Sequence, residues 1–197
     1  MAIDERFMSV PKGTIAAIVT VLEMREAAAA RPQHADPSWT IETVERPDPD
    51  FYLDLYRRVG APHLWYSRLE MERERLVALL HDPKVRLDVL RVEGRAEGLL
   101  EFDFRDDNVC EIAFFGVTPA LVGTGAARVM MNRAIRVAFE QPIERLWVHT
   151  NSIDHPKALD FYRRSGFTPV ERHIEMAQDP RLNGLLPRDC APHIPIV

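Results

Sequence analysis

The feature that most constrains this chain is the junction from Glu111 to Met131, which reads EIAFFGVTPALVGTGAARVMM. An apolar run predicts a strand, a short loop carries Gly123 and Gly125, and an apolar-periodic stretch predicts a helix over roughly 125–139. The first N–H groups of a helix have no partner within it, and the helix dipole is positive at that end. The loop therefore suits a phosphate. The alternative is a tight turn that packs the strand closely against the helix.

Two common phosphate-binding loops are excluded at this junction. A Walker A loop needs Lys followed by Ser or Thr after its last glycine, and no Lys follows here. A dinucleotide fingerprint needs a third glycine at position 128, where Arg128 stands. An anion at this loop would therefore be bound in neither of these two ways.

The remaining patterns predict several further elements. The stretch 15–24 is ambiguous, but its β-branched residues favour a strand. The Ala- and Pro-rich segment 26–37 predicts an irregular connection with room for a short helical turn, and the Pro-rich tail 177–197 predicts an extended segment. Caps, glycine stops and periodicity predict strands over 39–45, 144–151 and 167–176, a hairpin around Glu93-Gly94, a strand over 108–118, and helices over 47–60, 69–81 and 156–166.

This order of elements predicts a mixed α+β domain. A strand–helix–strand run forms a right-handed crossover between parallel strands. The run on either side of the glycine loop is therefore expected to give one parallel step at the centre of a mostly antiparallel sheet, with helices on both faces. The 197 residues suffice for one domain, 1–197.

Charge and composition exclude some classes of partner. The formal net charge is −5 and no Lys/Arg block occurs, which argues against nucleic acid. No apolar stretch reaches the length of a membrane span, and the charged start lacks a signal-peptide core, so a cytoplasmic protein is expected. The two cysteines, Cys110 and Cys190, lie far apart without metal spacing and are expected to be reduced thiols.

A second motif follows the strand predicted over 144–151. In DHPKALDFYRRSGF the spacing is A-x-x-x-Y-x-x-x-G-F, with Tyr162 at its centre. The glycine junction follows the pattern V-x-P-x-x-[QR]-x-x-G-x-[GA] from Val117 to Ala127 at every fixed position except Val122. Together the two motifs resemble those of the GNAT superfamily of acyl-CoA-dependent N-acyltransferases, over roughly residues 85–176. Two positions depart from the family pattern: Val122 replaces Gln or Arg, and His155 replaces a frequent Asn.

The resemblance implies acetyl-CoA as co-substrate, and no metal. It implies a variable acceptor-side part at 1–84, an acetyl-CoA-binding core at 85–176 and the tail at 177–197. The departure at Val122 is expected to weaken the contact with the pyrophosphate of the cofactor. The departure at His155 is expected to alter a hydrogen bond to its pantetheine arm. The implied cofactor-binding residues are Phe115, Gly116, Val117, Val122, Gly123, Thr124, Gly125, Ala126, Ala127 and His155.

The same resemblance implies direct transfer of an acetyl group to a primary amine of a small molecule or a protein. Tyr162 is expected to protonate the leaving thiolate; the alternative is a core tyrosine. Glu111 is expected to receive the amine proton through water, as a strand Glu does in the histone-type members of the family. Strand alternation places Glu111 on the face of Phe115 and Val117. The alternative for Glu111 is a solvent-facing residue or an ion pair.

Other residues give weaker hypotheses. Glu101 and Asp103 are the next candidates for the base. His149 is expected to pack or hydrogen-bond within its strand, since no third ligand at a sensible spacing supports zinc. Tyr56, Trp65 and Tyr66 are expected to belong to the core, or else to line an acceptor pocket.

Two further functions remain open at this point. The chain could be an acyl-CoA-binding sensor or regulatory module without catalysis, or a structural partner subunit that binds no coenzyme A. A homodimer is also compatible with the sequence.

Overall fold

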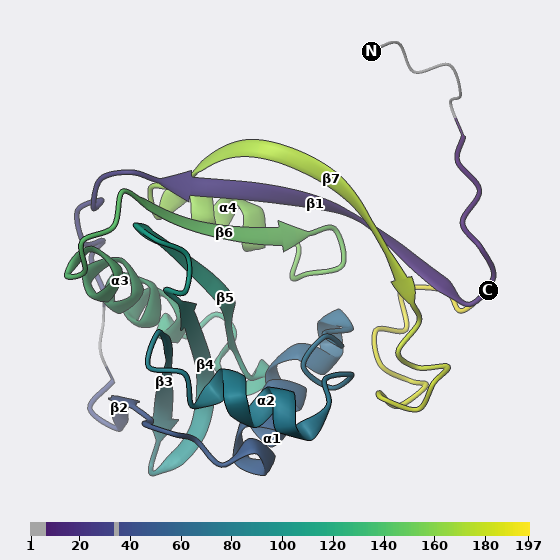
Figure 1. Ribbon diagram of the computed structural model, residues 1–197, viewed down its shortest axis with the longest axis horizontal. Helices are drawn as coiled ribbons and strands as arrows, with labels where there is room; N and C mark the ends of the chain where they lie inside the picture. Colours follow the sequence, from purple (N-terminus) through teal and green to yellow (C-terminus); the bar gives the residue numbers. More distant parts are fainter. Residues whose placement is uncertain (1–6, 34–35) are drawn as a thin grey trace.

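The computed structural model describes residues 7–33 and 36–197, which form one seven-stranded sheet with helices on both faces (Figure 1). The strands follow the spatial order β2-β3-β4-β5-β6-β1-β7. Their bounds are β1 Thr14–Met24, β2 Trp39–Thr43, β3 Val85–Val92, β4 Arg95–Asp103, β5 Val109–Val117, β6 Arg145–Asn151 and β7 Thr168–Gln178. The α-helices are α1 Pro49–Gly60, α2 Arg73–Leu80, α3 Ala126–Phe139 and α4 Ala158–Arg164.

The predicted α+β class and the central parallel step are confirmed. β5 and β6 pair in parallel and are joined through α3, whereas every other neighbouring pair in the sheet is antiparallel. The ambiguous first stretch is a strand, β1, inserted between β6 and β7. Its burial alternates along much of its length, as expected for a strand packed on one face.

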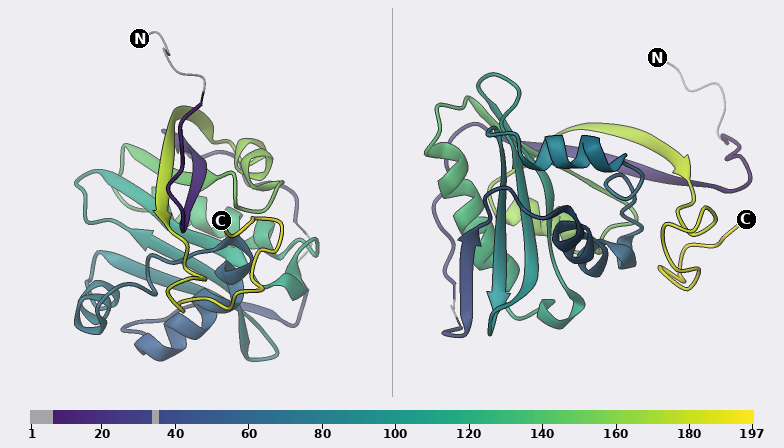
Figure 2. Two further views of the ribbon diagram at one scale, coloured as in Figure 1. Left: turned by 90° about the vertical axis from the view of Figure 1, so that its right-hand side faces the viewer. Right: turned by 60° about the horizontal axis from the view of Figure 1, so that its bottom comes forward.

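The helices cover the two faces of the sheet in pairs. Tyr52 and Leu55 of α1 pack with Leu76 of α2 against β3 and β4. Met130 of α3 and Tyr162 of α4 belong to a second core on the opposite face. Figure 2 shows α1 and α2 on one side of the sheet and α3 on the other. Among the described residues, no helix is both long and apolar enough to cross a membrane.

Two helices are shorter than the periodicity predicts. The helix expected over 69–81 begins at Arg73, because Leu69 and Glu70 are held in a turn by N–H donation to the Tyr66 carbonyl. The helix expected over 156–166 spans Ala158–Arg164. Its glycine stop is confirmed: Gly166 has φ +103°, a left-handed conformation that favours glycine.

The two irregular segments differ from each other. In the described part of 26–37 the chain is irregular and forms no helical turn; residues 34 and 35 lie outside the described residues. The tail is not extended: after β7 it folds into turns around Arg181, which is 3% exposed. The Arg181 guanidinium donates to the carbonyls of Cys190, Ala191 and Ile194, and this draws the chain into a loop.

Candidate active site

The main cavity opens where β5 and β6 separate. Their parallel pairing ends at Ile112 opposite Val148, so from Ala113 onward the edge of β5 that faces β6 has no strand partner. A cavity of about 710 Å³ occupies this opening. One wall comprises the glycine loop at 121–127 with α4, and we call it the loop side. The other wall is formed by the end of α1 together with the segment after it, residues 56–68, and by the start of β5, and we call it the helix side.

The glycine loop presents free backbone donors to the cavity. Gly123 and Gly125 have φ of +83° and +98°, and a Cβ on either would meet nothing within 4 Å. Within the described part of the chain, the N–H groups of Gly123, Gly125 and Ala127 have no hydrogen-bond acceptor. Three free donors at the start of α3 suit an anion, as the sequence predicts.

The other residues predicted in this loop have different positions. Val122 is half exposed and lines the cavity. Thr124 and Ala126 are absent from its wall. The Thr124 hydroxyl donates to the Leu121 carbonyl (2.8 Å) and accepts from the Ala126 N–H (3.3 Å), which holds the turn closed. The Ala126 side chain is fully buried in the core under α3.

Phe115, Gly116 and Val117 line the cavity from β5. Gly116 also has a packing reason: a Cβ there would lie 2.5 Å from Val59 of α1. The missing side chain therefore lets α1 approach the part of β5 that borders the opening. His155 lines the cavity from the loop that precedes α4, where its Nδ1 accepts from the Lys157 N–H (3.1 Å).

Tyr162 lies both in the core and on the wall of the cavity. Its ring is 6% exposed and packs against Phe115 and Phe167 at centroid distances of 6.2 and 5.9 Å. No described residue is hydrogen-bonded to its hydroxyl, which is nevertheless not sealed in the core and lies on the cavity wall. Burial raises the pKa of Tyr162 above its ordinary value, so the phenol keeps its proton and can donate it.

Strand alternation gave the wrong face for Glu111 relative to Phe115. β4 and β5 shift register: Phe102 lies opposite Ile112 and Glu101 opposite Phe114, which leaves Ala113 as an extra residue. Ile112 and Phe115 consequently both pack with the α3 core, although three positions separate them. Before the bulge, Glu111 lies opposite Asp103 and therefore shares its face.

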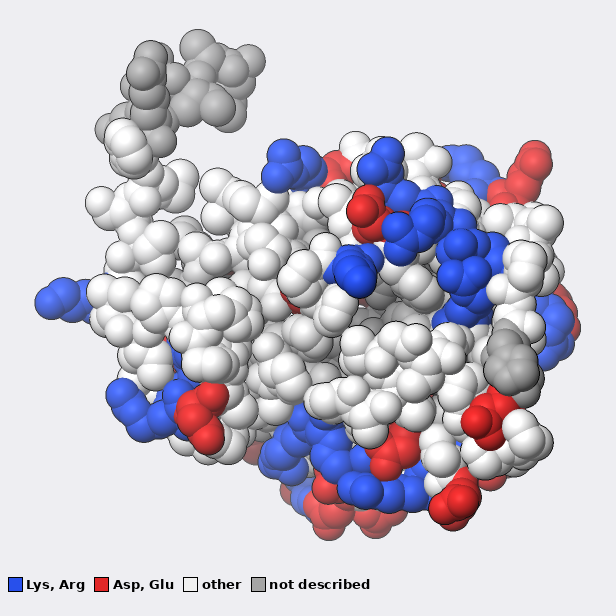
Figure 3. Space-filling view, turned by 180° about the vertical axis from the view of Figure 1, so that it is seen from behind, with Lys and Arg blue, Asp and Glu red and all other residues white. Residues whose placement is uncertain are grey.

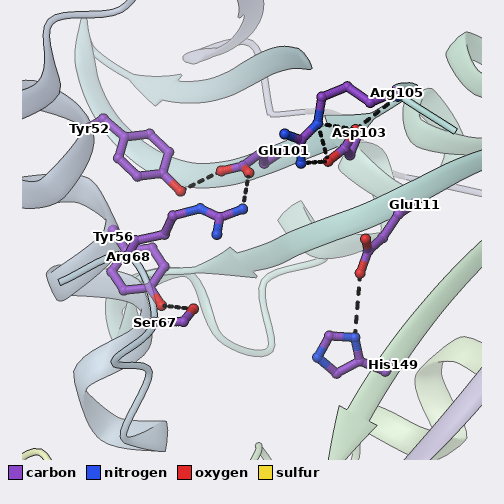
Figure 4. A network of polar contacts seen from close by, with 9 residues as sticks. All are labelled: Tyr52, Tyr56, Ser67, Arg68, Glu101, Asp103, Arg105, Glu111 and His149. Carbon is purple, nitrogen blue, oxygen red and sulfur yellow. Dashed lines mark hydrogen bonds and ion pairs between the residues drawn. The ribbon is translucent and has the colours of Figure 1, made fainter. Parts of the chain in front are cut away.

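Glu111 lies beside His149 on that face (Figure 4). The carboxylate is 3.6 Å from Nδ1 of His149, and the two side chains are 25% and 43% exposed. Hydrogen bonding to Glu111 raises the pKa of His149, against the lowering effect of burial. Glu111 is therefore placed at the cavity wall beside a histidine that gains a proton easily.

The two alternative candidates for the base, Glu101 and Asp103, are each already paired with an arginine. Glu101 is fully buried, accepts a hydrogen bond from the Tyr52 hydroxyl and pairs with Arg68 at 2.6 Å (Figure 4). Asp103 pairs with Arg105, also at 2.6 Å. The charge of Arg68 is in turn favoured by Glu101, which raises the pKa of the guanidinium although burial opposes this.

The aromatic residues of the helix side are divided between core and cavity. Tyr56 is 1% exposed, packs against the rings of Trp65 and Phe114 and also lines the cavity. The Tyr66 hydroxyl donates to Glu175 (3.0 Å), and its pKa is raised to about 12, first by burial and then by that carboxylate. The Trp65 indole donates to Asp154 (3.2 Å), which links the helix side to the loop before α4.

Sequence reasoning missed Arg68, Asp154 and Glu175. Their partners are Glu101, Trp65 and Tyr66, which lie 33, 89 and 109 positions away along the chain. Arg68 stood within the segment considered for the acceptor pocket, but no local pattern indicated its buried carboxylate partner.

Sequence comparisons agree with this geometry. A sequence model of the acetyltransferase (GNAT) family matches residues 38–167. A mycothiol acetyltransferase of Jonesia denitrificans is 35% identical over 68 residues, 34% of this chain and 21% of that protein. An uncharacterized N-acetyltransferase of Mycobacterium bovis is 29% identical over 93 residues, 47% of this chain and 59% of that protein. The matches thus span about a fifth and about three fifths of the lengths of these relatives.

Solved structures share the fold. A GCN5-related N-acetyltransferase from Sphaerobacter thermophilus superimposes with a TM-score of 0.60 at 14% identity, covering 83% of this chain and 52% of that one. An aminoglycoside acetyltransferase from an uncultured soil metagenomic sample has a TM-score of 0.58 at 21% identity, covering 71% of this chain and 95% of that one. At these identities the likeness concerns the fold.

Proposed function

The chain belongs to the acetyltransferase (GNAT) family, and we propose that it moves an acetyl group from acetyl-CoA to a primary amine by direct transfer. One observation carries the proposal. The cavity where β5 and β6 separate has the free N–H groups of the glycine loop on one side. Its wall also carries the hydroxyl of Tyr162, which has no hydrogen-bond partner among the described residues, and the carboxylate of Glu111, which precedes the bulge in β5. These are the groups that the reaction requires.

Residues of the loop side fit acetyl-CoA. The N–H groups of Gly123, Gly125 and Ala127 would hold the pyrophosphate, with open space over both glycines. Val122 brings no charged side chain, and its own N–H donates to the Pro119 carbonyl (3.3 Å), so the affinity rests on these three donors. When bound, acetyl-CoA supplies an activated acyl thioester. The unpaired edge of β5 beside Phe115 and Gly116 is suited to orient the thioester carbonyl and to polarise it with a backbone N–H.

Proton transfers balance the reaction. An alkyl amine has a pKa of about 10.4 and must lose a proton before it attacks at neutral pH. Glu111 receives this proton through water, and His149 beside it stabilises the carboxylate when the imidazole is charged. The new C–N bond forms as the C–S bond breaks. Tyr162 gives its proton to the leaving thiolate, and the products are an N-acetyl amine and coenzyme A.

A specific observation also supports the sensor as a second candidate. The loop side is complete as an anion site without any residue of the helix side. A module that binds acyl-CoA and does not catalyse would need no more than this. The presence of both Tyr162 and Glu111 at the cavity favours catalysis.

The test is release of coenzyme A thiol from acetyl-CoA over a panel of primary amines. The panel should include an aminoglycoside, since one structural neighbour is an aminoglycoside acetyltransferase. Calorimetry with acetyl-CoA runs in parallel. Amine-dependent thiol release that Tyr162→Phe suppresses supports the enzyme. Binding without release for any amine supports the sensor, and absence of binding refutes both.

A further inference from the structure

The strand β7 is an exposed edge of the sheet. Along its length only Glu175 and Ala177 are partly covered, and no described strand pairs with its outer side (Figure 1). Proteins usually protect such edges with short strands, bulges, prolines or charges. The other edge, β2, is only five residues long. In β7, Pro169 and a bulge at Val170, which the pairing with β1 skips, interrupt only the start of the strand, so the stretch 171–178 is left open.

The backbone of Ile174 directs its hydrogen-bonding groups to this open side. The Ile18 N–H donates to the Ser152 hydroxyl (3.0 Å), and the Ile18 carbonyl accepts from the Ser152 N–H (3.0 Å), so both groups of Ile18 point away from β7. Ile18 lies opposite Ile174, and opposite residues of an antiparallel pair either bond each other or both point away. The free groups of Ile174 are therefore available to another strand, as are those of Arg172 and Met176, two positions to either side.

Apolar side chains accompany the open edge. Ile18, Ile174 and Met176 are 38%, 57% and 49% exposed, and strand alternation places all three on one face. It is the face on which Leu22 and Met24 of β1 pack with the α3 core. Figure 3, which views the molecule from behind, shows mostly uncharged surface beside the N-terminal end of the described chain. The edge thus combines unpaired backbone with exposed apolar side chains, as a strand-pairing interface requires.

We infer that a second copy of this chain pairs antiparallel with β7, about a two-fold axis at Ile174. This inference goes beyond the proposed function and does not depend on it. The two Ile174 residues would exchange backbone hydrogen bonds, and the stretch 171–177 would pair with itself over its whole length. The other opposite pairs would be Arg172 with the partner's Met176, His173 with the partner's Glu175, and Glu171 with the partner's Ala177. Because Glu175 also lines the main cavity, the interface would border the candidate active site.

Charge complementarity selects this register over its neighbours. An axis at Arg172 would place two arginines opposite each other. An axis at His173 would place Glu171 opposite Glu175, and an axis at Glu175 would place that carboxylate opposite itself. Like charges directly opposite are unfavourable in a sheet. An axis at Met176 would pair only the stretch 174–178. The axis at Ile174 gives the longest pairing without opposed like charges.

The experiment is analytical ultracentrifugation of the full chain from low to high micromolar concentration, where we expect a reversible monomer–dimer equilibrium. Ile174→Pro removes an N–H that faces only the open edge, and so it leaves the hydrogen bonds to β1 in place. It should weaken the dimer about 10- to 100-fold, because each copy loses a hydrogen bond at the axis. Circular dichroism checks that the variant is folded.

A matched pair of variants at His173 tests the register. His173 is 55% exposed on its side chain, so substitution there leaves the core unchanged. His173→Glu places a carboxylate opposite the partner's Glu175 and should weaken the dimer several-fold, whereas His173→Lys places an ammonium there and should preserve or tighten it. Should Ile174→Pro disturb the fold, these two variants still decide the question.

Three outcomes would contradict the inference. A chain that is monomeric at every concentration overturns the interface. A dimer that a folded Ile174→Pro leaves unchanged also overturns it, because the copies then associate through another surface. Equal dimer affinities for His173→Glu and His173→Lys overturn the pairing centred on Ile174.

Discussion

The two sides of the cavity are built from different materials. The loop side is largely backbone: free N–H groups at Gly123, Gly125 and Ala127, next to an unpaired strand edge. The helix side is made of side chains held by partners from distant parts of the chain, such as Arg68 on Glu101 and Trp65 on Asp154.

This difference separates two kinds of recognition. Backbone donors bind any ligand with the right anion and change little with side-chain substitution. Paired side chains define a particular shape, and each depends on its partner being in place. Substitutions on the loop side are therefore expected to lower the affinity for the ligand. Substitutions on the helix side are expected to lower the stability of the fold or to change the choice of acceptor.

The largest expected effect is on the loop side. Gly125→Glu should nearly abolish acetyl-CoA binding, because a side chain and a negative charge would enter the anion site. Calorimetry gives the affinity. Gly94→Glu is the control: Gly94 also has positive φ (+84°) and open space but lies in the β3–β4 hairpin. If both variants bind acetyl-CoA as tightly as the wild type, the anion site lies elsewhere.

Tyr162→Phe should lower kcat by about 10²–10⁴-fold with little change in the Kd for acetyl-CoA, since the ring stays and only the proton donor is removed. Steady-state thiol release and calorimetry on the same preparation measure the two quantities. Unchanged turnover would leave Tyr162 as a core residue only.

On the helix side, Arg68→Leu should destabilise the fold by about 3–5 kcal/mol, because it leaves the buried Glu101 without its cation. Arg105→Leu removes a half-exposed partner of Asp103 and should cost about 1 kcal/mol or less. Urea unfolding of both variants measures the difference. Similar losses of unfolding free energy in the two variants would mean that burial does not make the Arg68–Glu101 pair more important for stability than the Arg105–Asp103 pair.

Glu111→Gln should slow the reaction near pH 7 by about 10²-fold, the lower end for an acid–base group. The rate should recover at high pH, as more acceptor arrives as free amine. The profile of kcat/KM from about pH 6 to pH 10 tests this, with circular dichroism to check folding. Superimposable profiles for the variant and the wild type would make Glu111 structural.

The smallest effect concerns His149. Its pKa is raised in the folded protein, so its pairing with Glu111 contributes stability that is complete below about pH 6.5 and is lost as the pH rises through the raised pKa. Glu111→Gln should lower the pKa of His149, because the largest raising cause is removed while burial still lowers the pKa and only the more distant charges of Asp154 and Glu175 still raise it. An NMR titration of the imidazole measures this. An unchanged pKa would mean that Glu111 and His149 are not coupled.

Much of the loop side could be predicted from the sequence, because its signals are local. Gly123 and Gly125 occur at a helix start, and the structure gives both positive φ. The parallel step followed from the strand–helix–strand order, and the α+β class followed from that step. Thr124 and Ala126 could not be assigned in the same way, since only the folded turn shows that they close it and fill the core.

The helix side could not be predicted, because its determinants are long-range. Nothing near Arg68 in the chain indicates the buried Glu101, and nothing near Trp65 indicates Asp154. The tail was also missed: its prolines favour an extended chain, but the buried Arg181 gathers three carbonyls and bends it. In both cases a side chain and its distant partner, rather than local propensity, decide the structure.

The extra residue at Ala113 divides β5 into two stretches in which the alternation of faces is out of step. Before it, Glu111 shares the face of Asp103 while Ile112 packs with the α3 core; after it, Phe114 lies on the α1 face and Phe115 packs with the α3 core. A substitution at Glu111 is therefore expected to act on the face of Asp103, whereas one at Phe115 acts on the α3 core. A graft of this strand from a relative that lacks the bulge would instead exchange the faces of one stretch, so any such transplant has to carry the inserted position with it.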